Sequence, residues 1–192
     1  IGRGGCYYRK ADVVEDGRIS FESRYITDVI TDKALEYLDE LADGEAPFYL
    51  SVHYTAPHDP WDEDQHPKEY VELYRDCEFT ATPDLPVHPR QIPSAPYGTG
   101  EKRKSLLRGY YAAVTAMDAN LGRLLKRLKE KGVERDTIVI FMADNGMNMG
   151  HHGIWGKGNG TFPFNMYDTA VKVPLIVSWP SHYPGGLVSE RM

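Results

Sequence analysis

Residues 137–157 read Thr-Ile-Val-Ile-Phe-Met-Ala-Asp-Asn-Gly-Met-Asn-Met-Gly-His-His-Gly-Ile-Trp-Gly-Lys. The part 137–143 is an unbroken apolar run rich in β-branched side chains, which is typical of a parallel strand buried on both faces. Polar residues follow at once, beginning with Asp144 and Asn145. Because ligands of open α/β sheets gather beyond the carboxyl ends of the strands, this stretch predicts a central strand with a binding site at its end.

Helical and strand patterns alternate along the rest of the chain. Apolar residues recur every three or four positions in 27–44 and again in 104–131, which predicts two helices. Residues 48–53 read as a strand, and a last strand is expected at 173–179. The order helix, strand, helix, strand, strand predicts an α/β sandwich with a mostly parallel sheet flanked by helices.

The remaining segments complete one partial domain over residues 1–192. Residues 1–25 have weak periodicity and predict irregular structure or a short hairpin around Asp16-Gly17. A short helix is expected near 67–74. Residues 80–103 contain five prolines, which favour a long extended excursion over the surface.

Composition excludes several classes of function. The chain of 192 residues has 41% hydrophobic and 26% charged residues, which is ordinary for a globular protein. Its net charge of -6 and the lack of a basic patch argue against a nucleic-acid binder. No apolar run is long enough to span a membrane. The two cysteines, Cys6 and Cys77, form neither a disulfide framework nor a metal-ligand cluster.

Asp144 and Asn145 are the candidate metal ligands. A carboxylate and an amide oxygen suit hard cations such as Ca²⁺ or Mg²⁺, but Ca²⁺ takes about six to eight oxygens, so two ligands are only part of a site. The alternative is an Asn-Gly turn that ends the strand, with Asp144 as a cap. Spacing alone leaves both interpretations open.

His58, Lys157 and His152 are the candidates for binding and chemistry. His58 lies in Ala-Pro-His-Asp-Pro, where two prolines stiffen a loop that could aim the imidazole at an anion or a leaving group. Lys157 lies in a glycine-rich loop where it could bind a phosphate or sulfate as a point charge. His151 and His152 are adjacent, and we expect His152 to face the site. Taken alone, a backbone-bonded histidine and a solvated lysine are the favoured alternatives.

Taken together, these segments resemble the formylglycine-dependent sulfatase family of the alkaline-phosphatase-like superfamily. They follow the order and spacing of that family over roughly residues 26–186. The matching blocks are Pro47–Pro60, Tyr111–Asp118 with Gly122, Ala143–Gly146, Gly150–Lys157, Val173–Ile176 and Trp179-Pro180.

The resemblance implies a fold, an activity and a role for each candidate. It implies the alkaline-phosphatase-like sandwich and the hydrolysis of a small-molecule or carbohydrate sulfate ester. Asp144 and Asn145 look like two of the Ca²⁺ ligands. His58 looks like the histidine that contacts the ester and helps the leaving group depart, and Lys157 like the lysine that contacts sulfate. His152 is similar to a family residue near the pocket.

The chain departs from the family at the nucleophile. The family uses a cysteine or serine in Cys/Ser-x-Pro-x-Arg, oxidised to formylglycine. Cys6 is followed by Tyr-Tyr-Arg and Cys77 by Glu-Phe-Thr, so neither fits. The family's paired aspartates and its Gly-Lys-Trp-His segment are also absent. We therefore expect an internal fragment, starting at Ile1, with the formylglycine upstream of it and no activity alone.

Two other functions stay open at the level of sequence. A phosphate or phosphonate ester hydrolase of the same superfamily would use the same Asp144, Asn145 and Lys157, and the identity of the nucleophile would discriminate it. The other alternative, from a different class, is a non-catalytic anion-binding fragment.

Overall fold

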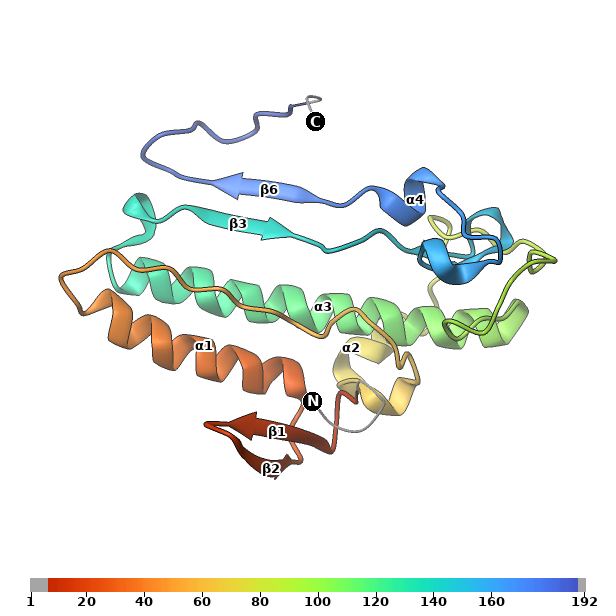
Figure 1. Ribbon diagram of the computed structural model, residues 1–192, viewed down its shortest axis with the longest axis horizontal. Helices are drawn as coiled ribbons and strands as arrows, with labels where there is room; N and C mark the ends of the chain where they lie inside the picture. Colours follow the sequence, from red (N-terminus) through yellow and green to blue (C-terminus); the bar gives the residue numbers. More distant parts are fainter. Residues whose placement is uncertain (1–6, 190–192) are drawn as a thin grey trace.

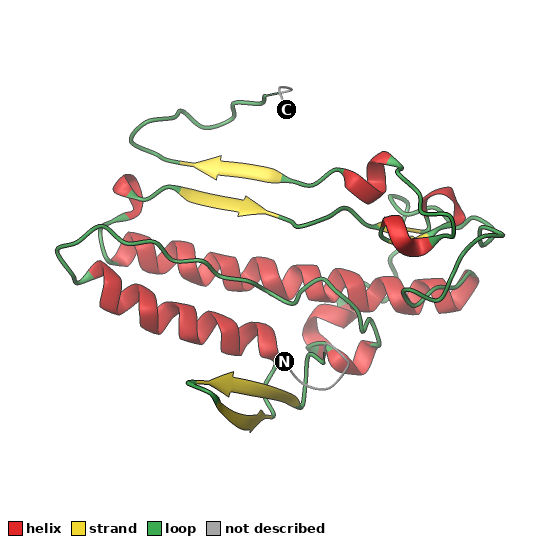
Figure 2. Cartoon of the chain, viewed as in Figure 1, coloured by secondary structure: helices red, strands yellow, loops and turns green. Residues whose placement is uncertain are grey.

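A computed structural model describes residues 7–189 and places its long helices in one layer (Figures 1 and 2). The layer contains α1 (Ile26–Ala42), α2 (Lys68–Glu72) and α3 (Gly100–Glu130). The helices expected at 27–44, 67–74 and 104–131 are thus confirmed.

Helices α1 and α3 run side by side in the same direction, and polar pairs join them along their length (Figure 1). The pairs are Asp28 with Asn120 (2.8 Å), Asp32 with Arg123 (2.6 Å), Asp39 with Arg127, and Asp43 with Lys131 (2.7 Å). Both members of each successive pair advance along the chain, as parallel helices require. Because exposed ion pairs contribute little individually, this ladder mainly fixes the register of the two helices.

Small residues on α3 let the loop of residues 56–61 approach the helix closely. Ala112, Ala113 and Ala116 have no exposed surface. At Gly109 a Cβ atom would lie only 2.0 Å from the carbonyl oxygen of Trp61, so no side chain fits there. The loop that carries His58 is therefore seated directly on the helix.

Two apolar clusters hold this loop at its two ends. Ala56 packs in a cluster with Tyr8 and Tyr25, against the alanines of α3. Trp61 packs in the other cluster, with Leu107 and Trp155 among its members. The loop 56–61 thus spans the boundary between two buried groups of side chains.

The strands form three antiparallel pairs among the described residues. β1 (Ala11–Glu15) and β2 (Arg18–Glu22) form the hairpin expected around Asp16-Gly17, whose φ angles of 48° and 75° suit a tight two-residue turn. β3 (Val139–Met142) pairs with β6 (Leu175–Ser178), and β4 (Asn148–Met149) pairs with β5 (Trp155–Gly156). The two strands expected at 137–143 and 173–179 therefore exist, each within one or two residues of its predicted ends.

The expected parallel pairing and two-sided burial of 137–143 were wrong for this structure. Among residues 7–189, β3 pairs only with β6, in antiparallel register, and its side chains alternate between half-buried and exposed, with Ile140 58% exposed. Residues 48–53 are extended but join no ladder in the described part of the chain. An apolar run is buried on both faces only where neighbouring strands and helices cover it, and in the described part of the chain β3 has one neighbouring strand.

Short elements complete the described part. They are η1 (Glu63–Gln65), η2 (Glu134–Asp136), η3 (His151–Gly153), η4 (Gly158–Gly160) and α4 (Asp168–Val171). Cys77 is a free thiol, and Cys6 lies outside the described residues. Within residues 7–189, every helix is too short or too polar to cross a membrane.

Candidate functional site

Side chains from Tyr8, Trp61 and His66 fix the backbone on either side of His58. They bond three carbonyl oxygens that lie within four residues of one another. The bonds are Tyr8 Oη to His58 O (2.7 Å), Trp61 Nε1 to Pro57 O (3.0 Å) and His66 Nε2 to Pro60 O (3.0 Å). The stiff loop that the two prolines predicted is therefore present, and three partly buried hydrogen bonds hold it in addition to the prolines.

One nitrogen of the His58 imidazole, Nδ1, contacts Asp59, the next residue in the chain. Its Nδ1 lies 3.0 Å from Asp59 Oδ1 and 3.0 Å from the Asp59 carbonyl oxygen. The bond to the carboxylate raises the pKa of His58 above its usual range, against the effect of burial. The same bond lowers the pKa of Asp59.

Lys157 lies close enough to both groups to act on them. Its positive charge offsets part of the rise in the pKa of His58, and it also lowers the pKa of Asp59. Packing explains the proximity, because the rings of Trp61 and Trp155, which flank the two loops, lie 6.4 Å apart. The structure thus brings together His58 and Lys157, which are 99 positions apart in the sequence.

The proline-rich segment 80–103 forms hydrogen bonds to the backbone of the segment that carries Lys157. Gln91 bonds both backbone groups of Trp155: its Nε2 donates to the carbonyl oxygen and its Oε1 accepts from the N–H, each at 2.8 Å. Backbone bonds from His88 to Gly153 and from Ile92 to Gly160 extend the contact. The prolines of 80–103 predicted an excursion, but nothing in their pattern indicates that it closes over this loop.

Asn165 holds the other side of the Lys157 loop. Its Nδ2 lies 3.3 Å from the Lys157 carbonyl oxygen and 3.1 Å from that of Gly158, while its backbone N–H donates to Gly158. The ammonium group of Lys157 takes no part in these bonds. The loop is therefore rigid at its backbone, with the lysine side chain left to meet a ligand.

Asp144 and Asn145 follow β3 as predicted, and their oxygens suit a hard cation. Asp144 is exposed, and Asn145 Nδ2 donates to the carbonyl oxygen of Gly146 (2.9 Å), so Asn145 Oδ1 remains an acceptor. The ladder between Asn148 and Gly156 brings this segment alongside the start of the Lys157 loop. Within residues 7–189 no cluster of three or more His, Cys, Asp or Glu could hold a metal ion. These residues therefore fit as two ligands of a larger set.

His152 lies away from these contacts. Its backbone is left-handed (φ 58°) and its exposed ring stacks on Tyr167, with the ring centroids 3.8 Å apart. His151 turns inward and accepts a bond from the Met149 N–H. The described contacts of His152 include neither His58 nor Lys157, so its role at the pocket stays a prediction.

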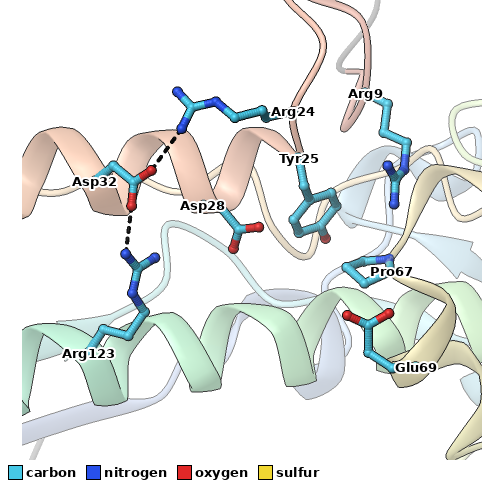
Figure 3. Close-up of a pocket in the computed structure, with 8 residues that line it drawn as sticks. All are labelled: Arg9, Arg24, Tyr25, Asp28, Asp32, Pro67, Glu69 and Arg123. Atoms are coloured by element: carbon cyan, nitrogen blue, oxygen red, sulfur yellow. Dashed lines mark hydrogen bonds and ion pairs between the residues drawn. The ribbon is translucent and has the colours of Figure 1, made fainter.

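An open hollow of about 520 Å³ lies elsewhere, between the starts of α1 and α2 and the middle of α3 (Figure 3). Its charges compensate one another, since Asp32 bridges Arg24 and Arg123 at 2.9 and 2.6 Å. Neither His58 nor Lys157 lines it. We therefore do not assign the chemistry to this hollow.

Comparison with known proteins decides the family. The family model described as Sulfatase matches residues 6–192, which is nearly the whole chain. This chain belongs to the sulfatase family. The resemblance of the ordered blocks around His58, Asp144 and Lys157 is thereby confirmed.

Named relatives and solved structures agree with this assignment. Human iduronate 2-sulfatase is 30% identical over 173 residues, covering 78% of this chain and 30% of that protein. The N-acetylglucosamine-6-O-sulfatase of Bacteroides thetaiotaomicron is 27% identical, covering 98% and 44%. A structure from Bacteroides fragilis named as a sulfatase superposes with a TM-score of 0.73 at 27% identity, covering 93% and 37%. The sulfatase chain thus shares the α/β, alkaline-phosphatase-like fold and spans under half the length of these relatives.

Three residues of the site were not predicted from the sequence: Asp59, Gln91 and Asn165. Asp59 stands in the motif beside His58, and an acidic residue next to a candidate histidine is a signal that could have found it. Gln91 and Asn165 act on backbone groups far from them in sequence or across a turn. No composition or spacing marks such residues.

Proposed function

We propose that these residues supply part of a sulfatase active site, and that the whole protein hydrolyses an organic sulfate ester. The observation that carries the proposal is the proximity of His58 and Lys157 on two separately anchored loops. A cation beside a protonatable imidazole suits an ester whose sulfuryl oxygens are anionic and whose leaving oxygen needs a proton. Family membership supports this interpretation.

Each residue has a separate task in the proposed reaction. Lys157 neutralises charge on the sulfuryl oxygens as a point cation. His58 donates a proton to the departing alkoxide. The backbone clamps of Gln91 and of Tyr8 keep the two loops in place before substrate arrives, so little reorganisation is needed at the reaction.

Two groups from outside the described contacts complete the proposal. Asp144 and Asn145 Oδ1 would hold Ca²⁺, or Mg²⁺, which supplies further positive charge at the sulfuryl group when it is bound. A formylglycine would supply the nucleophile, and no cysteine or serine of residues 1–192 stands in the required Cys/Ser-x-Pro-x-Arg motif. We therefore expect residues 1–192 alone to show no turnover.

The substrate class is a small-molecule or carbohydrate sulfate ester. Two relatives named above are sulfatases whose names specify sugar substrates. The net charge of -6 does not suit a nucleic acid as partner. A sugar sulfate brings the localised anion that Lys157 suits and the alkoxide leaving group that His58 suits.

The test is the hydrolysis of an aryl sulfate by the whole protein and its variants. Lys157→Met and His58→Ala should each lower kcat/KM by about 10²-fold to 10³-fold. Lys172→Met and His53→Ala are matched controls, since both side chains are exposed, with Asp168 and Ser51 as their partners, and both variants should keep full activity. Full activity of Lys157→Met, or faster turnover of a phosphate or phosphonate ester than of the sulfate, would contradict the proposal.

A further inference from the structure

The two oxygens of Asp59 decide which nitrogen of His58 carries the mobile proton. Both the Oδ1 and the backbone oxygen lie 3.0 Å from Nδ1, and both are acceptors, so Nδ1 keeps its hydrogen whether the ring is neutral or charged. The described contacts of His58 include none at Nε2. The proton that the ring gains and loses is therefore the one on Nε2.

We infer that Asp59 is a positioning residue for the proposed sulfatase reaction, which holds His58 as an imidazolium with its transferable proton at Nε2. The inference rests on the proposed function for its chemical purpose. Its geometric basis, the Asp59–His58 pair, stands independently of any substrate.

Burial and the neighbouring cation both act against a charged His58. Partial burial lowers the pKa of the imidazole, and Lys157, which repels a protonated His58, lowers it further. Asp59 opposes that repulsion and has the larger effect on the pKa of His58. The charged groups that act on His58 among the described residues are therefore Asp59 from its own loop and Lys157 from the loop after β5.

In the proposed proton transfer, Asp59 neither gains nor loses a proton. The sulfur forms its new bond to the nucleophile as the ester S–O bond breaks, and the electron pair of that bond stays on the leaving oxygen. This oxygen takes the proton from His58 Nε2. His58 is left neutral, with the hydrogen still on Nδ1 and hydrogen-bonded to Asp59, which remains a carboxylate throughout.

His66 in the same region shows the opposite arrangement and serves as an internal reference. Its Nε2 is bonded to Pro60 O and its Nδ1 to the Tyr25 hydroxyl, with no carboxylate at either nitrogen. Burial lowers the pKa of His66 to about 4, so the ring is neutral near pH 7. One loop thus contacts a histidine whose neutral form is favoured and contains a histidine whose charged form is favoured.

The direct test is NMR titration of the imidazole nitrogens in the 192-residue chain. In the wild type, the pKa of His58 should lie above the usual range of a histidine, because of its bond to Asp59, and its hydrogen should sit on Nδ1 in the neutral form. Asp59→Asn keeps an acceptor but removes the charge, so the pKa of His58 should fall by about one unit. Asp59→Ala should give the same fall and a larger share of the Nε2–H tautomer.

Asp62→Asn is the matched control, because Asp62 is an exposed carboxylate three residues further along the same segment. It should leave the pKa and tautomer of His58 unchanged. The signals of His66 should report an intact fold in the two Asp59 variants, whereas in Asp62→Asn the pKa of His66 should fall, because the charge of Asp62 raises it. An unchanged pKa of His58 in Asp59→Asn and Asp59→Ala would overturn the inference.

The rate of sulfate-ester hydrolysis by the whole protein separates this inference from the proposed function. Because His58 must be protonated to act as an acid, kcat should fall as the pH rises through its pKa. In Asp59→Asn that fall should begin about one unit lower, with KM little changed, and Asp59→Glu should restore part of the difference. An unmoved profile overturns the inference alone, whereas a wild type that hydrolyses no sulfate ester overturns the proposed function.

Discussion

The helical layer and the β3–β6 pair differ sharply in how well they are covered. Leu107, in the N-terminal third of α3, has no exposed surface, while Leu175 of β6 is 64% exposed. His58 and Lys157 belong to the loops that pack with the helical layer through Trp61 and Trp155. Asp144 and Asn145 extend from the poorly covered strands. The proposed anion-binding half of the site is therefore held by packing within this chain, and the proposed metal-binding half has much less support.

The largest effect should come from a cavity in the helical layer. Leu107→Ala should lower the free energy of unfolding by about 4 kcal/mol, because it removes a fully buried side chain. Ile140→Ala in β3 should cost under about 1 kcal/mol, because Ile140 already faces solvent. Urea denaturation measures both, and equal losses would mean that the two regions do not differ as described.

Two glycines of α3 compare a covered position with an open one within a single helix. Gly109→Ala should destabilise the fold by about 3 kcal/mol, since its Cβ would press on the carbonyl oxygen of Trp61. Gly122→Ala meets open space and should stabilise the helix by about 0.8 kcal/mol. Denaturation curves that place both variants on the same side of the wild type would contradict the close seating of loop 56–61.

Acid should weaken the loop through His66. Its pKa is lowered to about 4 in the folded chain, so the unfolded chain binds the proton more readily and stability falls as the pH drops from about 6.5 towards 4. Between pH 6.5 and 4.5 the loss should be about 2 kcal/mol. His66→Gln should remove that part of the pH dependence. An equally steep loss in the variant would assign the effect to other groups.

The smallest effect should be that of Ca²⁺ on the isolated chain. With Asp144 and Asn145 as two ligands of a larger set, we expect millimolar affinity, and stabilisation of only about 0.4 kcal/mol when the Ca²⁺ concentration equals Kd. Asp144→Ala should abolish it, and Asp12→Ala, an exposed carboxylate of β1, should not. Tight calorimetric binding by residues 1–192 would contradict the division of the site into a supported and an unsupported half.

The sequence predicted those structural features that depend on residues close together in the chain. The helices and the turn at Asp16-Gly17 follow from periodicity and from residues that accept a positive φ. The apolar run 137–143 predicted a strand correctly but not its burial, because burial depends on neighbouring strands that periodicity does not specify. The position of 48–53 outside any ladder has the same cause.

Function was predictable only as far as motifs extend. His58, Lys157, Asp144 and Asn145 stand in recognisable blocks, but no spacing rule indicates that Trp61 and Trp155 bring the first two together. The clamp by Gln91 is a contact over 64 positions and has no local signal. Such contacts arise from tertiary packing and have to be read from the structure.

A double-mutant cycle on sulfate-ester hydrolysis tests the central claim most directly, namely that His58 and Lys157 act together on one sulfuryl group. The cycle compares kcat/KM of the whole protein with those of His58→Ala, Lys157→Met and the double variant. If the two side chains serve one transition state, the double variant should lose about tenfold less than the product of the single losses. Single losses that simply multiply would show that the two residues act independently and would contradict the account.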